Sequence, residues 1–139
     1  MATTTATITL ASSDIADNSL SISNTMTMTT AGTTTGITET TGLARRKVAS
    51  ASLADLITVA NTDVTAAKSA KVYIKNTSTA TDKYGLIGLG DSTGTPIYIG
   101  RLYGGDWMLF PWDANSGEDI TLTMNDATET VIEYMVFFE

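Results

Sequence analysis

Residues 19–29 read SLSISNTMTMT, and their apolar and polar side chains alternate almost without a break. Leucine, isoleucine and methionine occupy even positions, with serine or threonine between them. A period of two places these apolar side chains on one face of an extended strand. The stretch therefore predicts a strand with one buried face and one face in water.

The same parity occurs nearer the N-terminus. In TTATITL, residues 4–10, the apolar side chains Ala6, Ile8 and Leu10 again fall on even positions. The turn-rich segment ASSDIADN separates this run from residues 19–29. We therefore expect two strands joined by a turn, each with threonine or serine on its outward face.

Composition extends this prediction to the whole chain. Threonine alone contributes 27 of the 139 residues, and threonine, valine and isoleucine together contribute 44. Side chains branched at Cβ lose rotamer freedom in helices and fit a pleated surface well. The composition therefore indicates a β protein.

Further short β-favouring runs follow, separated by turn signals. They are residues 48–52, 56–60, 70–76, 84–90, 96–103, 106–112, 119–124 and 130–139. The predicted fold is all-β: an antiparallel β-sandwich or a jelly-roll-like barrel with an extended Thr-rich N-terminal arm. We expect the arm, with its two strands, over residues 1–44 and the sandwich body over residues 45–139. A single helical turn is expected at residues 51–56, where Ser52 is a possible N-cap.

Turn residues predict the layout of the second half. Gly104 and Gly105 fit a two-residue hairpin with positive φ at both positions, within a C-terminal antiparallel meander. Pro111 lacks an N–H and should end a strand or lie at a sheet edge. The glycines of residues 84–90 indicate a bulge or a close backbone approach, because no helix follows to complete a phosphate site.

The residue inventory excludes most enzyme chemistry. The chain has no histidine and no cysteine, so it lacks a Ser-His triad, a thiol nucleophile and the usual zinc ligands. The acidic cluster around residues 106–119 matches turn chemistry better than a catalytic pair. Residues 113–119 resemble the start of a calcium loop but depart from its spacing. We expect no enzymatic activity, no cofactor and no metal.

The net charge of the chain limits the classes of binding partner that we expect. The formal net charge is −7, which repels nucleic acid and anionic membrane surfaces, and neither is an expected partner. The basic cluster is Arg45, Arg46 and Lys47, at the start of the body. It is either a solvated strand start or an ion-pairing anchor for an acidic neighbouring subunit.

Aromatic residues concentrate late in the chain, with Trp107, Trp112 and Phe137 among them. Residues 130–139 form a strand that is largely apolar on both faces. Such a strand is either central in a two-layer core or pressed against another subunit. Together with the basic cluster, these three aromatic residues are the candidate contacts with a subunit or a capsid.

Four stretches carry a resemblance to a known class of proteins. They are TTGLARRKVAS, KVYIKNTS, RLYGGDWMLFPWD and VIEYMVFFE. They resemble small structural proteins in the virions of tailed bacteriophages, in particular capsid decoration or cement proteins. The resemblance implies a β-rich body, a homo-oligomer such as a trimer, and attachment to the outer shell, often through an N-terminal arm.

The expected function is therefore structural. The chain would bind the major capsid protein or another virion protein at the capsid surface and cement or decorate capsomers as a symmetric oligomer. The alternative is a phage tail or fibre component that binds host-surface glycan. In that case Trp107, Trp112 and Tyr103 beside Asp106 would form the sugar platform.

Overall fold

The computed structural model describes residues 3–14, 19–29, 39–50, 53–62, 64, 70–114 and 118–139. The chain divides into two compact units, Met1–Thr38 and Glu39–Glu139. We call the first the hairpin unit and the second the body.

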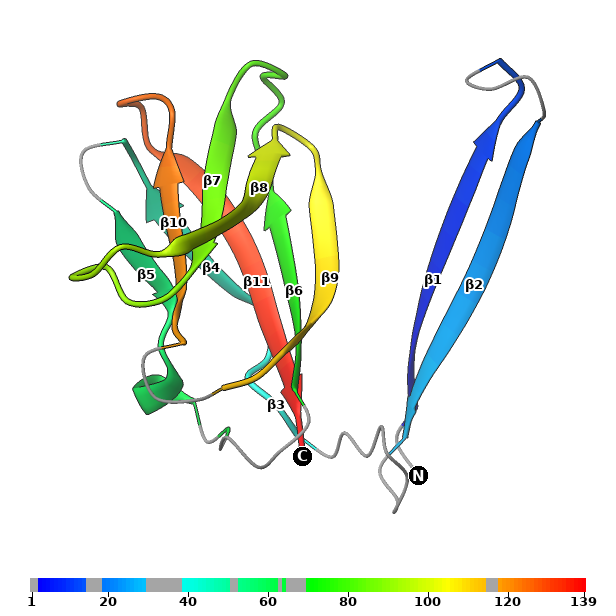
Figure 1. The fold of residues 1–139 in the computed structure, drawn as a ribbon, viewed down its shortest axis with the longest axis horizontal. Coiled ribbons are helices and arrows are strands. Elements are labelled where there is room, and N and C mark those ends of the chain that lie inside the picture. The colour runs from blue at the N-terminus through cyan, green and yellow to red at the C-terminus, as the bar shows by residue number, and fades with distance from the viewer. Residues whose placement is uncertain are drawn as a thin grey trace. The chain divides into compact units, whose positions relative to one another are not determined.

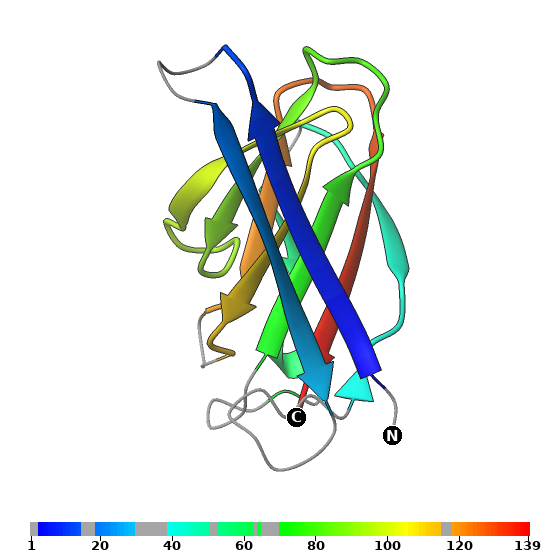
Figure 2. The same ribbon diagram turned by 90° about the vertical axis from the view of Figure 1, so that its right-hand side faces the viewer.

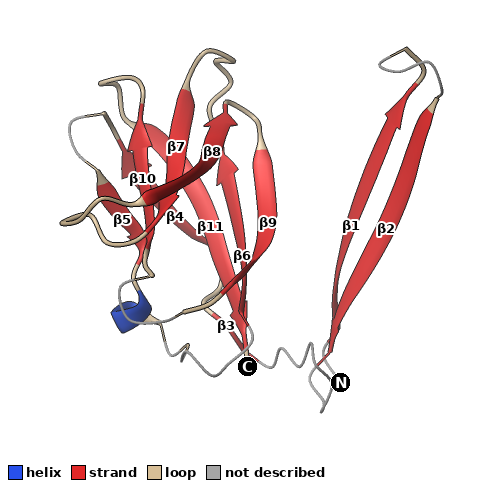
Figure 3. Ribbon diagram, viewed as in Figure 1, coloured by secondary structure: helices blue, strands red, loops and turns tan. Residues whose placement is uncertain are grey.

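Most of the described residues lie in strands, and helix among them is limited to one short 3-10 turn, η1 (Val59–Asn61) (Figure 3). The strands are β1 (Thr3–Ser12), β2 (Leu20–Thr29), β3 (Glu39–Thr40), β4 (Ala44–Val48), β5 (Ala54–Ile57), β6 (Ala70–Asn76), β7 (Tyr84–Leu89), β8 (Ile97–Tyr103), β9 (Trp107–Trp112), β10 (Ile120–Met124) and β11 (Thr130–Phe138). The all-β prediction is confirmed.

The hairpin unit is built from β1 and β2, which run side by side along their whole lengths (Figure 2). Leu10 lies opposite Ile22, so the apolar side chains of both strands share one face. On the other face the hydroxyls of Thr7 and Thr25 lie 2.9 Å apart in a hydrogen bond. Two strands with one apolar and one polar face are therefore confirmed, but the expected burial of the apolar face is wrong for Ile8, Leu10, Leu20 and Ile22, which are exposed.

The body consists of two antiparallel sheets (Figure 1). One has the strand order β5-β10-β7-β8. The other has the order β3-β11-β6-β9, and β4 also pairs with β11. The described strands form an antiparallel sandwich and do not close into a barrel.

The core of the body is filled by alternate side chains of the two sheets. Val72 and Ile74 on β6, Ile120 and Leu122 on β10, and Ile132 on β11 are fully buried. Neighbouring positions on β6 are half-buried, which is the burial pattern that a period of two predicts.

Residues 39–44 belong to the body and not to the predicted arm. Thr40 lies opposite Phe137 in the pairing of β3 with β11. The Thr41 N–H donates to the Val136 carbonyl at 3.0 Å. The body therefore begins at Glu39, while residues 30–38 of the predicted arm lie outside the described residues.

The prediction of a helical turn at residues 51–56 is wrong for residues 53–56, the part of this segment that the structure describes. Residues 54–57 form β5, where Asp55 lies opposite Thr121 of β10, and residues 51 and 52 are outside the described ranges. Leu56 and Ile57 are buried. Burial against β10 depends on a partner far away in the sequence, and it outweighs the weak local preference for helix.

The turn between β8 and β9 carries the chain from one sheet to the other. β8 pairs with β7 and β9 pairs with β6, so neither the predicted hairpin nor a simple meander forms. The Asp106 N–H closes the turn on the Tyr103 carbonyl at 2.9 Å, and only Gly105 has a positive φ, 89°. Gly104 is required for a different reason, since a Cβ there would overlap the carbonyl oxygen of Ala80.

Two predictions about irregular strands are confirmed. Pro111 lies on β9, an edge strand, where its missing N–H does not interrupt a central ladder, although β9 continues to Trp112. The pairing of β7 with β8 shifts register between Ile87 and Gly88. A Cβ on Gly88 would lie 2.9 Å from the Thr121 hydroxyl oxygen, so a close approach accompanies this bulge.

Candidate functional surfaces

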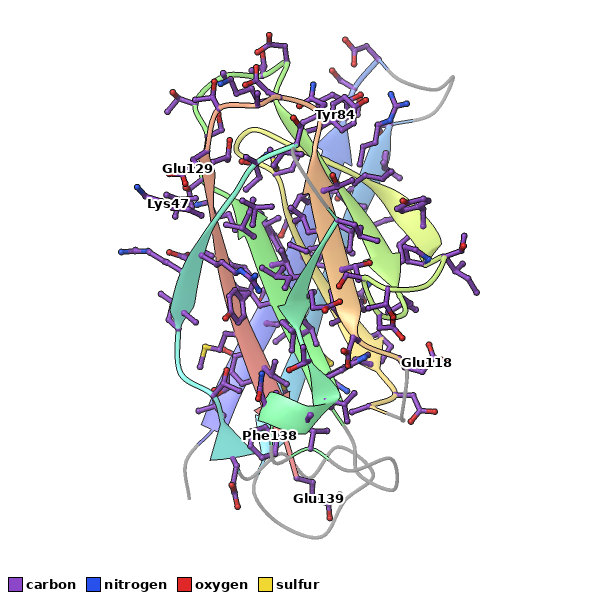
Figure 4. All side chains as sticks on the ribbon, turned by 90° about the vertical axis from the view of Figure 1, so that its left-hand side faces the viewer. Lys47, Tyr84, Glu118, Glu129, Phe138 and Glu139 are labelled. Atoms are coloured by element: carbon purple, nitrogen blue, oxygen red, sulfur yellow. The ribbon has the colours of Figure 1, made fainter. Side chains whose placement is uncertain are left out.

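The basic cluster lies on β4, where each of its three cations contacts another part of the body. The Arg45 guanidinium pairs with the Glu133 carboxylate at 2.9 Å. Lys47 Nζ lies 3.3 Å from the Glu129 carboxylate, and the two side chains are adjacent in Figure 4. The Arg46 guanidinium donates to the backbone carbonyl of Asp55.

These contacts have a structural explanation. The salt bridges join the β4 side chains to carboxylates at and just before β11, the strand that pairs with β4. The side chains of Arg45 and Lys47 remain 67% and 68% exposed, so each salt bridge contributes at most about 1 kcal/mol. The solvated strand start is therefore an adequate reading of the cluster, and an anchor for an acidic neighbour stays a prediction.

The two tryptophans have opposite environments. Trp107 is 49% exposed, and its ring centroid lies 6.4 Å from that of Tyr73. Trp112 is only 4% exposed, and its indole N–H donates to the Glu118 carbonyl at 2.8 Å. Trp112 therefore has little surface to offer a partner, and it cannot join Trp107 in a sugar platform.

Phe137 lies on the face of β11 that points away from the core. Ile132, Val136 and Phe138 on the other face are buried. Phe137 is half-buried opposite Lys71 of β6. β11 is thus a central strand of a two-layer sandwich, which is one of the two explanations offered for its apolar character. A contact with another subunit through its outer face stays a prediction.

Tyr73 on β6 shares this outer face, opposite Met135 of β11. Partial burial raises the pKa of the Tyr73 phenol, and the negative charge of Glu133 raises it further. Glu133 lies on the same face, opposite Lys75 of β6, so charged side chains lie next to the Tyr73 phenol.

The carboxylates mainly organise turns. Asp106 accepts the Tyr103 N–H at 3.0 Å, and Asp119 accepts the Val59 N–H at 2.8 Å. The described residues contain no group of three or more acidic, histidine or cysteine side chains that could hold a metal ion. The calcium-like segment falls partly outside them, because residues 115–117 are not described.

Two further aspartates show the same use of carboxylates. The hydroxyl and N–H of Thr93 lower the pKa of Asp91 by donating to its carboxylate. The N–H of Thr128 is the main cause of the lowered pKa of Asp126, and nearby Lys83 contributes. Both groups are held ionised by the loops that they shape, which is a structural role.

A groove of about 430 Å³ opens between β8 and β9. It is lined by Ile87, Ile99, Gly100, Arg101, Leu102, Gly105, Asp106, Trp107 and Met108. Among the described residues of the body, six large apolar side chains are exposed, and five of them lie on β8 or β9; these five are Ile97, Tyr98, Ile99, Tyr103 and Trp107. We call these five side chains the edge patch.

Sequence reasoning identified Trp107 and Tyr103 but missed Ile97, Tyr98 and Ile99. A signal was available, since three consecutive large apolar residues place apolar side chains on both faces of a strand. Only the strand order reveals that this strand lies at an edge, with nothing described beyond it.

Comparison with protein-family models, with curated proteins and with solved structures gives no match to this chain. Among the described residues, no helix has the length and apolar character needed to cross a membrane. The surfaces described above are thus the observations that bear on function.

Proposed function

We propose that this chain is a structural virion protein that attaches to the outer surface of a phage capsid and cements or decorates capsomers as a symmetric oligomer. Its partner would be the major capsid protein or another virion protein. The resemblance noted in the sequence supports this proposal, and the main structural support is the hairpin unit.

The hairpin unit has the properties of an adhesive segment. Neither β1 nor β2 contains a charged residue. On its apolar face, Ile8 is 42% exposed, Leu10 is 51% exposed and Ile22 is 41% exposed. A two-stranded hairpin is only marginally stable in water, so covering this face would stabilise it. The outer edges of the two strands also lack the charges that normally prevent pairing with another strand.

Symmetry would strengthen such an attachment. When one hairpin of an oligomer binds, the next hairpin meets its site at a high effective concentration, and avidity gains of about 10²–10⁴ result. Weak individual contacts are then enough for stable occupancy of a shell. A trimer, which the resemblance implies, would be one such arrangement.

Replacing Ile8 and Leu10 together by threonine tests the apolar face. The proposed contact would bury both side chains, so their loss should weaken binding to the shell by about 100-fold, while threonine preserves strand propensity. The measurement is occupancy of purified virions stripped of the protein and then incubated with each variant, followed by co-sedimentation and cryo-EM.

The matched control is the double variant Thr7→Ser and Thr9→Ser, which changes the polar face of the same strand. It should bind as the unmodified chain does. A truncation that begins at Glu39 should not bind, and this cut keeps β3 in place. Equal occupancy by the threonine variant and by the control would refute attachment through the apolar face.

One observation favours the alternative function, glycan binding by a tail or fibre component. The groove between β8 and β9 has the exposed ring of Trp107 and the Asp106 carboxylate on its walls. An aromatic face beside a hydrogen-bonding group is a common way to hold a sugar ring. On this proposal a glycan array with the intact chain gives specific signals that Trp107→Ala abolishes, and the absence of any specific signal would dismiss it.

A further inference from the structure

The sheet that contains β11, β6 and β9 carries much of the positive charge of the chain on its outer face. The register of these strands and of β4 places their charged side chains on the side away from the buried core. We call this surface the β6 face, and its charged members are Arg45, Lys47, Lys71, Lys75 and Glu133. It holds four of the eight basic residues of the chain and one of the fifteen acidic residues. The β6 face therefore has a formal charge of +3, and the remainder of the chain has one of −10.

The two lysines of β6 are the cations of this face that a partner can neutralise. Those of β4 are already used within the body, because they pair with carboxylates in β11 and just before it. Lys71 and Lys75 form no ion pair among the residues that the structure describes. Glu133 lies opposite Lys75, but its carboxylate pairs with the Arg45 guanidinium at 2.9 Å. The available charge is therefore centred on β6 and not on the basic cluster of β4.

Uncharged side chains separate Lys71 from Lys75. The two lysines are four residues apart on one strand, so their Cα atoms are about 13 Å apart. Tyr73 lies between them, with Leu109 of β9 opposite it on one side and Met135 of β11 opposite it on the other. A row of apolar and aromatic side chains thus crosses the sheet between two positively charged positions.

The surroundings of the lysines are suited to a protein partner. Trp107, which also belongs to the edge patch, lies opposite Lys75, and its ring centroid is 6.4 Å from that of Tyr73. Tyrosine, tryptophan and methionine are enriched in protein–protein interfaces. The lysines are half-buried, and a lysine can pack its stem against neighbours while its ammonium group stays at the surface.

We propose that the β6 face binds an extended acidic segment of a partner protein. Two carboxylates of this segment, four residues apart, meet Lys71 and Lys75, and an apolar side chain midway between them packs on Tyr73. Side chains two residues apart in an extended segment point the same way and have the spacing of alternate positions in β6. The face itself does not depend on the proposed function; where that function holds, the segment belongs to the capsid protein or another virion protein.

The distribution of charge on the β6 face selects a peptide over other anions. At physiological ionic strength exposed charges are screened beyond about 8 Å, so Lys71 and Lys75 attract groups at the face although the whole chain is negative. A nucleic acid or an anionic membrane presents closely spaced negative charges, and some of these would meet Glu133 and the apolar row. A peptide can place a carboxylate at each lysine and apolar side chains elsewhere.

A synthetic peptide tests the face without a virion. Glutamate and leucine alternate at every second position of this peptide, and threonine fills the positions between them. Titration of the isotope-labelled full-length chain with the peptide should shift the backbone NMR signals of β6, β9 and β11. A peptide with glutamine in place of glutamate should bind at least about tenfold more weakly, because it lacks the charges that the lysines neutralise.

Charge reversal at one lysine tests the position of the contact. Lys71→Glu should weaken binding of the acidic peptide by about tenfold, because repulsion replaces attraction. The matched control Arg101→Glu makes the same change in net charge on β8, in the other sheet, where Arg101 is exposed. This control should bind within about twofold of the unmodified chain, because screening limits the effect of distant charges. Lys75→Gln should also weaken binding; glutamine is used because a glutamate there would face Glu133.

Stripped virions connect this test with the proposed function. Where the unmodified chain occupies the shell, Lys71→Glu should lower its affinity by about tenfold and Arg101→Glu should not. An unmodified chain that leaves the shell empty would contradict capsid attachment alone, and the peptide titration then decides on the β6 face.

Several results would overturn the acidic-peptide site. They are the absence of NMR shifts with the acidic peptide, shifts confined to other strands, and equal losses for Lys71→Glu and Arg101→Glu when far-UV circular dichroism shows both variants folded. Tighter binding of oligothymidylate or of phosphatidylserine vesicles than of the acidic peptide would assign the face to a different anion. Self-association of the chain that Lys71→Glu abolishes would assign it to a second copy.

Discussion

Replacing Gly104 by alanine is expected to lower the free energy of unfolding of the body by about 4 kcal/mol. A Cβ at this position would overlap the carbonyl oxygen of Ala80 and lie 3.0 Å from that of Ser78. Both obstacles are backbone atoms, so no side-chain rotation can relieve the clash. Urea denaturation followed by circular dichroism measures the loss.

Gly100→Ala is the matched control for this variant. Gly100 lies in β8, close in sequence to Gly104, and a Cβ there meets nothing within 4 Å. Alanine also restricts the unfolded chain, so this change should alter stability by less than about 1 kcal/mol. Equal denaturation midpoints for the two variants would show that the backbone can move away from Gly104 without penalty.

Replacing Asn76 by leucine is the change with the second-largest expected effect. Asn76 is fully buried at the end of β6. Its side-chain amide donates to the carbonyls of Lys83 and Leu102 at 3.1 and 3.0 Å, and its side-chain oxygen accepts the Ser78 N–H at 3.0 Å. Leucine would leave these three backbone groups without their side-chain partner, and we expect a loss of about 4 kcal/mol in the free energy of unfolding.

Asn125→Leu separates burial from hydrogen bonding. Asn125 makes similar bonds, donating to the Asp82 carbonyl at 3.0 Å and accepting the Tyr84 N–H at 2.9 Å, but its side chain is exposed. Water can replace these bonds, so the loss should be about 1 kcal/mol. Equal losses in the two variants, measured by urea denaturation, would contradict the role assigned to the buried amide.

The sequence predicts strands well in this chain because their signal is local. The predicted strand at residues 70–76 coincides with β6, and the one predicted at 96–103 is one residue longer than β8. Alternation of side chains over a few residues specifies such a segment without reference to the rest of the chain. The helical turn expected at 51–56 failed because β5 depends on its pairing with β10.

The order of the strands in the two sheets cannot be predicted from local sequence patterns. The glycines between β8 and β9 indicated a turn, and a turn is found there, but it connects two sheets. Whether consecutive strands pair with each other or with distant ones depends on packing across the whole core. The exposed edge at β8 follows from that strand order.

The candidate contacts illustrate the same limit. The cluster of Arg45 and Lys47 is visible in the sequence, but its partners Glu133 and Glu129 lie near the other end of the chain. The two tryptophans are different, because 107 and 112 have opposite parity. Their positions on one strand predict opposite faces, so the sequence contained the information that Trp112 and Trp107 do not form one surface.

The pairing of β3 and β4 with β11 has a mechanical consequence. A pull transmitted through residue 38 enters the body at Glu39. From there the force reaches β11, because β3 pairs with Phe137–Phe138 and β4 pairs with residues 130–134 of that strand. Several ladder hydrogen bonds therefore share the force, and β11 itself is fixed by Ile132 and Val136, both fully buried. Tension on the hairpin unit would thus be resisted by the core of the body.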